Sequence, residues 1–135
     1  MKKILFLMLL VITPGLLAQE ESAPTPRIAI KIPLGQTLSL DGMTIEFIEV
    51  LEDSRCPEDV VCVWAGQAKV KVRVSKDGVA QDAQELIVGK SGKNHIAQFD
   101  ESTLKAIALS PYPTTKNTGA RDYVLLVIKE KLEDQ

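Results

Sequence analysis

From residue 27 onward, short apolar or alternating runs recur along the chain, separated by turn-forming residues. The clearest run spans 67–75, where valine alternates with lysine or arginine. Alternation of this kind places one set of side chains on each face of a strand, so one face is buried and the other meets water. Such runs, recurring at short intervals, are typical of an all-β domain.

Seven segments are predicted as strands, at 27–32, 37–40, 43–51, 67–75, 85–88, 100–110 and 123–128. Segment 100–110 leaves two alternatives open, because Asp100-Glu101-Ser102 would also cap a short helix. We favour a strand there because its neighbours on both sides are strands. About seven mostly antiparallel strands predict a single small β-sandwich or a partly open barrel.

Local signals add detail to this fold. Asp41-Gly42 lies between two apolar runs and is the strongest hairpin signal in the chain, and Lys76-Asp77-Gly78 is a second. The apolar phase slips at Ile48, which predicts a β-bulge in the strand that carries the expected core residues Ile45, Phe47 and Val50. Segment 123–128 is apolar at every position, which predicts a central strand covered on both faces.

The first 18 residues have the pattern of a secretory signal peptide. Lys2 and Lys3 precede an apolar run at 4–12, and Ala18 stands before a polar stretch. The run is too short to span a bilayer, which needs about 20 apolar residues. We therefore expect cleavage after Ala18, no transmembrane segment after cleavage, a flexible leader at 19–26, a β-domain at 27–135, and a periplasmic or secreted location.

Charge narrows the classes of partner. Removing residues 1–18 leaves 14 basic and 18 acidic groups, a formal charge of −4. A mildly acidic surface argues against nucleic acid and anionic lipid as partners. An unknown protein or another envelope component is the expected partner, and no cofactor is expected.

The two cysteines predict one disulfide. An exported chain with only Cys56 and Cys62 most simply joins them. So short a loop gains roughly 2–2.5 kcal/mol in the chain-entropy treatment, so the bond shapes its loop more than it holds the fold. If the chain is extended there, Trp64 shares a face with Cys62 and packs against the disulfide and the core. Gly66 then releases the chain through a bulge or a positive φ.

The segment from Asp53 to Gly66 follows the pattern D-S-R-C-P-x-x-V-x-C-x-W-A-G, and an alternating valine strand comes after it. In this it resembles a group of small secreted bacterial β-domain proteins of uncharacterised function. The likeness is good over 50–74 and elsewhere is only a pattern of strands. It implies an exported β-domain with a cysteine-bridged loop, and it implies no catalytic residue.

Candidate partner-binding residues lie in two constrained loops. The first loop offers Arg55, Pro57 and Trp64, because scaffolded loops often carry binding residues. The second is the long polar connection 111–119, which either presents Tyr112 to a partner or, as the simpler interpretation, crosses between the two sheets.

Neither metal nor catalytic chemistry has a strong signal. Four carboxylates surround the first loop, at Glu52, Asp53, Glu58 and Asp59, but they lack calcium-loop spacing and read better as a solvated acidic loop. His95 is the single histidine and is interpreted as a polar surface residue, not a metal ligand.

Two functions are carried forward. The first is an exported, non-enzymatic binding or structural module of the cell envelope, with a protease inhibitor as one variant in which Arg55 or Lys116 is the exposed basic residue. The alternative is a small hydrolase that uses carboxylates such as Asp53 or Asp59. That alternative requires a pocket holding two acids with opposed environments.

Overall fold

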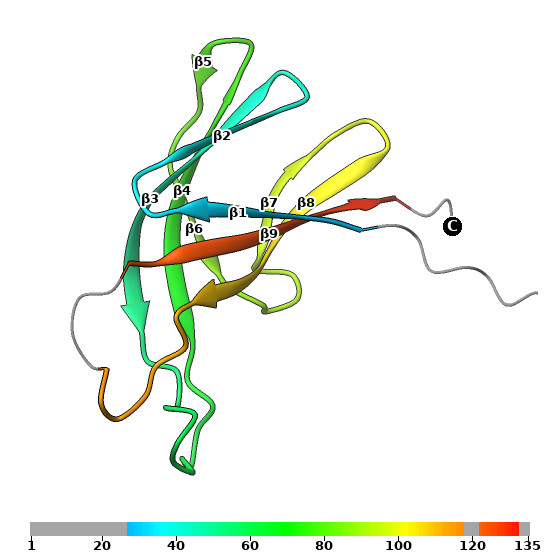
Figure 1. Cartoon of the computed structure of the whole chain (residues 1–135). Helices are drawn as coiled ribbons and strands as arrows, with labels where there is room; N and C mark the ends of the chain where they lie inside the picture. The colour runs from blue at the N-terminus through cyan, green and yellow to red at the C-terminus, as the bar shows by residue number, and fades with distance from the viewer. Residues whose placement is uncertain (1–26, 118–121, 133–135) are drawn as a thin grey trace, which may run out of the picture.

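The computed structural model describes residues 27–117 and 122–132, so the expected signal peptide and leader lie outside the described residues. The described part holds nine strands, with no helix, in two antiparallel sheets (Figure 1). The strands are β1 (Ile28–Pro33), β2 (Thr37–Leu40), β3 (Met43–Asp53), β4 (Ala68–Lys76), β5 (Val79–Ala80), β6 (Gln84–Ile87), β7 (His95–Gln98), β8 (Ser102–Ser110) and β9 (Val124–Lys131).

The two sheets form a sandwich-like arrangement. One sheet has the order β1-β9-β8-β7, and the other has β2-β3-β4-β5, with β6 also paired to β4. Neither sheet closes into a barrel, so the sandwich alternative of the all-β prediction is confirmed. No helix in the described part of the chain is long and apolar enough to cross a membrane.

All seven predicted strands are present, and their ends differ from the prediction by a few residues. The ambiguous segment 100–110 is strand β8, not a helix. The prediction missed two strands. Strand β5 has only two residues, and β7 is a four-residue edge strand that pairs with β8.

The predicted hairpin turns are confirmed. Asp41 and Gly42 have φ values of 49° and 76° between the paired strands β2 and β3. Two successive positive φ values match the right-handed twist of the flanking strands, which is why an aspartate-glycine pair suits this turn. Asp77 and Gly78 repeat the geometry, with φ values of 51° and 78°, between β4 and β5.

The predicted bulge in β3 is also confirmed. The register with β4 shifts between Phe47 and Glu49, and it shifts again between Val50 and Glu52. Bulges bend a strand and increase its twist. The last pair of the β3–β4 ladder joins Asp53 to Ala68, so the cysteine segment begins where this ladder ends.

The core lies between the sheets and draws side chains from both. Its fully buried members include Phe47, Ile45, Val70 and Val72 from one sheet, and Ile32, Leu104, Leu125 and Val127 from the other. Ile45 and Phe47 are buried as expected, and Val50 is partly buried against the core.

Strand β9 corrects one expectation. It lies between β1 and β8, so it is an interior strand as predicted. The face that carries Leu125 and Val127 is fully buried, whereas the other face is covered only in part, because Ile128 is buried but Val124 and Leu126 are partly exposed. In a sandwich the outer face of each sheet has no second layer over it, so an unbroken apolar run does not require cover on both sides.

Candidate functional site

The candidate site is the segment that joins β3 to β4, residues 54–67, here called the cystine loop. It projects from one end of the molecule, beyond the sheets (Figure 1). Cys56 and Cys62 form the predicted disulfide, with their Cα atoms 5.9 Å apart. A disulfide is consistent with an oxidising compartment.

Backbone hydrogen bonds hold the base of the cystine loop closed. The Ser54 N–H donates to the Gln67 carbonyl at 2.9 Å, and the Cys56 N–H donates to the Ala65 carbonyl at 2.9 Å. Gly66 has a φ of +68°, which confirms the predicted positive φ. A Cβ at Gly66 would lie 1.8 Å from the Ser54 carbonyl oxygen, so no larger residue fits this backbone.

The connection after β8 braces one side of the loop. The Glu58 N–H donates to the Pro113 carbonyl at 3.0 Å. The Asp59 carboxylate accepts the Thr115 N–H at 3.0 Å and also the Thr115 hydroxyl. These bonds hold the pKa of Asp59 below its ordinary value.

This bracing corrects the expected role of connection 111–119. Strands β8 and β9 are antiparallel neighbours in the same sheet, so the connection does not cross between sheets. The connection is long because its described part runs out alongside the cystine loop and bonds to it before the chain returns to β9.

Arg55 ties the loop to the domain. Its guanidinium makes two bonds to the Asp53 carboxylate, at 2.7 and 2.9 Å. It also donates to the carbonyls of Leu109, at 2.6 Å, and Pro111, at 3.1 Å. Its Cζ lies 4.7 Å from the centre of the Tyr112 ring. One side chain therefore joins the end of β3, the end of β8 and the connection that follows β8.

Asp53 completes this cluster. Its carboxylate also accepts the Tyr123 hydroxyl at 2.9 Å, from the residue that precedes β9. The Arg55 hydrogen bonds are the largest cause that lowers the pKa of Asp53, and the Tyr123 bond adds to them against an opposing effect of burial. The side chains of Arg55 and Asp53 are only 10% and 8% exposed. The hypothesis that Arg55 is an exposed basic bait residue is therefore wrong, because its guanidinium pairs with Asp53 and is turned away from solvent.

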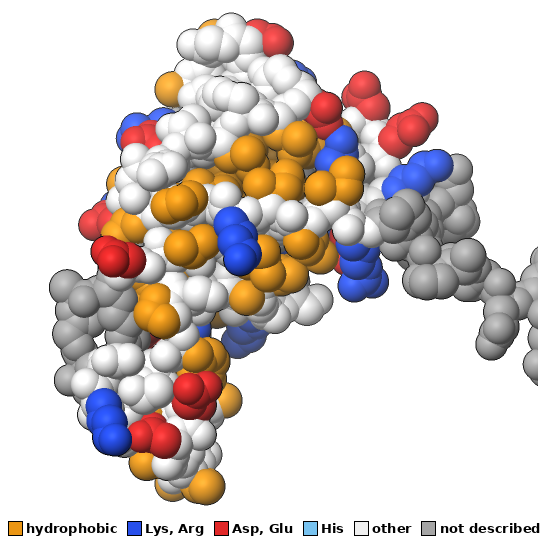
Figure 2. Space-filling model, viewed as in Figure 1, with side chains coloured by type: hydrophobic (Ala, Val, Ile, Leu, Met, Phe, Trp, Pro, Cys, Tyr) orange, Lys and Arg blue, Asp and Glu red, His pale blue; other side chains and the backbone are white. Residues whose placement is uncertain are grey.

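The outer end of the cystine loop is apolar and open to solvent. Val60 is 43% exposed, Val61 101%, Val63 99% and Trp64 82%. These four residues are here called the apolar tip. Figure 2 shows hydrophobic side chains at the outermost end of the cystine loop, and charged side chains lie farther back toward the sheets.

The expectation that Trp64 packs against the disulfide and the core is wrong. The chain bends at Val63 and Trp64 and is not an extended strand there, so Cys62 and Trp64 do not share the face of a strand. The indole is also 82% exposed, so it does not pack against the core.

An open groove runs beside Trp64. It has a volume of about 610 Å³, and its lining includes the indole, Glu52, Gln67 and Lys90. The Glu52 carboxylate accepts the Ser54 hydroxyl at 2.8 Å and the Gln67 amide at 3.2 Å, and these bonds lower the pKa of Glu52. The groove therefore has a fixed anionic group on its lining.

The carboxylates of the hydrolase alternative do not have the environments that it requires. The pKa values of Asp53 and Asp59 are both lowered, each by hydrogen-bond donors of its own. An acid and base pair needs one of the two raised. Within residues 27–117 and 122–132, no three His, Cys, Asp or Glu side chains group as metal ligands, and His95 begins β7 as an exposed residue.

The structure brings Arg55 and Tyr112 together, and the four predicted partner-binding residues differ in exposure. Trp64 and Tyr112 are exposed, at 82% and 46%, Pro57 is partly buried, and Arg55 faces inward. The sequence interpretation missed the tip valines. The available signal was an apolar run, Val60-Val61-Cys62-Val63-Trp64, inside a segment that a disulfide holds out of the sheets.

Comparisons with known proteins add no family. No family model, curated protein or solved structure matches this chain.

Proposed function

We propose that the protein is an exported, non-enzymatic binding module of the cell envelope, and that the apolar tip is its contact surface. The proposal rests on one observation above all: Val61 and Val63 are almost completely exposed, and Trp64 is 82% exposed, on a loop that is covalently closed. A run of exposed large apolar side chains is characteristic of an interaction site.

The bracing of the loop supports the same function. The disulfide, the Asp53–Arg55 pair and the bonds from Thr115 all restrict the loop before any partner arrives. A loop already held in one conformation loses less conformational entropy when it binds, so more of the contact energy appears as affinity. The sequence pattern of a signal peptide and the disulfide support a periplasmic or secreted location.

Crosslinking in the producing cells tests the proposal. A photoreactive diazirine amino acid is placed at position 61, and the matched control carries it at position 79. Val79 is also an exposed valine, at 69%, but lies in β5 at the opposite end of the molecule (Figure 1). We expect crosslinked protein or lipid from position 61 and none from position 79. Equal labelling from both positions, or none from either, would refute the proposal.

In the described part of the chain, Asp53 and Asp59 have no arrangement that favours the hydrolase alternative, because the pKa values of both are lowered. Asp53 and Asp59 hold together the two segments that position the apolar tip. Loss of either carboxylate is therefore expected to loosen the loop.

A further inference from the structure

The apolar tip has a shape that restricts its partner. Val61 and Val63 are exposed at 101% and 99%, which means that neither side chain packs against the other or against the loop. The tip is therefore a set of separately exposed apolar side chains and not a packed patch. A rigid protein surface would need a separate pocket for each of them, whereas a fluid apolar phase surrounds separate side chains without any matching shape.

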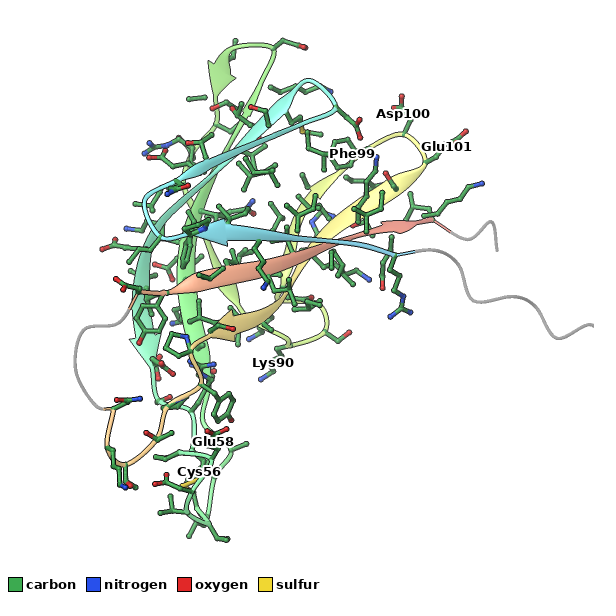
Figure 3. The ribbon with its side chains drawn as sticks, viewed as in Figure 1. Cys56, Glu58, Lys90, Phe99, Asp100 and Glu101 are labelled. Atoms are coloured by element: carbon green, nitrogen blue, oxygen red, sulfur yellow. A yellow bond between two sulfur atoms is a disulfide. The ribbon has the colours of Figure 1, made fainter. Side chains whose placement is uncertain are left out.

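The polarity of the loop changes along its length. No residue from Val60 to Gly66 carries a charge. The nearest acids along the chain, Glu58 and Asp59, come before this run, and Figure 3 places Glu58 back from the outer end of the loop. Glu52 and Lys90 line the groove beside Trp64, on the side of the sheets. Asp59 is held toward the domain by Thr115. An apolar end with charges set behind it is the arrangement of a surface that enters a membrane interface.

The backbone of the tip limits how deeply the tip could enter a lipid bilayer. The N–H groups of residues 61–64 have no hydrogen-bond partner among the described residues. Unpaired backbone groups are costly in the hydrocarbon centre of a bilayer, but water and lipid head groups satisfy them at the interface. Trp64 suits the same depth, because an indole has a large apolar surface and one N–H donor.

We propose that the apolar tip inserts into the interfacial region of a zwitterionic lipid bilayer. This inference rests on the proposed function and names the partner of the tip. Zwitterionic lipid is specified because the acids behind the tip and the formal charge of −4 after removal of residues 1–18 repel an anionic surface. The side chains that enter are Val61, Val63 and Trp64, and the braced loop holds them outward without further folding.

Trp64 is the single tryptophan of the chain, so its fluorescence reports on the tip alone. The exported, oxidised protein is titrated with phosphatidylcholine vesicles and, separately, with vesicles that contain phosphatidylglycerol. We expect the emission to shift to shorter wavelength and the protein to co-sediment with phosphatidylcholine. Binding should be equal or weaker with phosphatidylglycerol, and added salt should not weaken binding to phosphatidylcholine.

A matched pair of variants assigns the binding to the tip. Val61→Ser combined with Val63→Ser should weaken vesicle binding at least about 10-fold, because two apolar side chains no longer leave water. Val79→Ser replaces an exposed valine at the opposite end of the molecule from the tip, so it should leave vesicle binding unchanged. Circular dichroism shows whether both variants keep the β-fold.

Each contrary result is decisive. No emission shift at about 1 mM lipid would overturn the inference, since that concentration detects even weak association. Binding that requires anionic lipid, or that survives the double valine substitution, would also overturn it. A protein crosslinked through position 61, together with no vesicle binding, would overturn the lipid inference but leave the proposed function intact. No crosslink of any kind from position 61 would remove the proposed function as well.

Discussion

Replacing Arg55 with alanine tests the brace that positions the cystine loop. The substitution removes two hydrogen bonds to Asp53, two hydrogen bonds to the carbonyls of Leu109 and Pro111, and the contact with the Tyr112 ring. It takes from the Asp53 carboxylate, which is only 8% exposed, the guanidinium that makes two hydrogen bonds to it. We therefore expect Arg55→Ala to destabilise the whole domain as well as the loop.

The expected cost follows from burial. Removal of one partner from a buried ion pair costs about 3–5 kcal/mol when the remaining charge has no other partner. The Tyr123 hydroxyl remains bonded to Asp53 and offsets part of this cost. We expect a loss of about 2–4 kcal/mol in the free energy of unfolding, measured by urea denaturation with far-ultraviolet circular dichroism. Trp64 fluorescence is a poor probe of unfolding because the indole is exposed in the folded state.

The pH dependence gives this prediction a sign. The folded pKa of Asp53 is lowered, so its contribution to stability is present above the unfolded pKa, about 3.9, and is lost as the pH falls through the folded value. The stability difference between the wild-type protein and Arg55→Ala should therefore be full at neutral pH and should shrink in acid.

Arg73→Ala is the matched control. Arg73 pairs with Glu46 at 3.3 Å, but both side chains are more than 40% exposed, so the loss should be under about 1 kcal/mol. If Arg55→Ala costs no more than Arg73→Ala, or if its cost does not fall in acid, the reasoning about the brace is refuted.

Three further predictions concern the loop itself. Gly66→Ala should lower the free energy of unfolding in urea by about 2 kcal/mol or more, because the new Cβ would meet the Ser54 carbonyl. Gly42→Ala, with open space around it, should lower it by about 1 kcal/mol, and equal losses would contradict the close approach at Gly66. Thr115→Val should bring the pKa of Asp59, followed by NMR titration, back toward its ordinary value, and an unchanged pKa would show that Thr115 is not its partner. Cys56→Ser with Cys62→Ser should cost roughly 2 kcal/mol and keep the β-fold, so loss of the β-sheet circular dichroism signal would contradict the view that the disulfide shapes only its loop.

The fold was predictable because its signals are local. Valine alternation in β4, the Asp41-Gly42 turn and the phase slip at Ile48 each act through neighbouring residues, and each appears where the sequence indicates. The two missed strands lack such a signal. Strand β5 is only two residues long. Strand β7 is formed by pairing with β8, and the sequence alone does not show which strands pair in the sheet.

The site was less predictable because long-range contacts build it. Nothing local shows that Arg55 reaches carbonyls 54 and 56 residues away, or that Thr115 reaches Asp59, 56 residues away. Those contacts hold Arg55 toward the domain and brace the loop where it extends beyond the sheets. Trp64 was expected to pack inward because an extended chain would place it on the same face as Cys62, but the chain bends at Val63 and Trp64 and the indole is 82% exposed.

Acrylamide quenching of Trp64 fluorescence, in the oxidised protein without lipid or any partner, tests the central claim most directly. A braced loop that holds its apolar tip in water predicts a quenching constant and an emission maximum close to those of a free tryptophan derivative. A blue-shifted emission that acrylamide barely quenches would place the indole against the fold, and the apolar tip would then not exist as a contact surface.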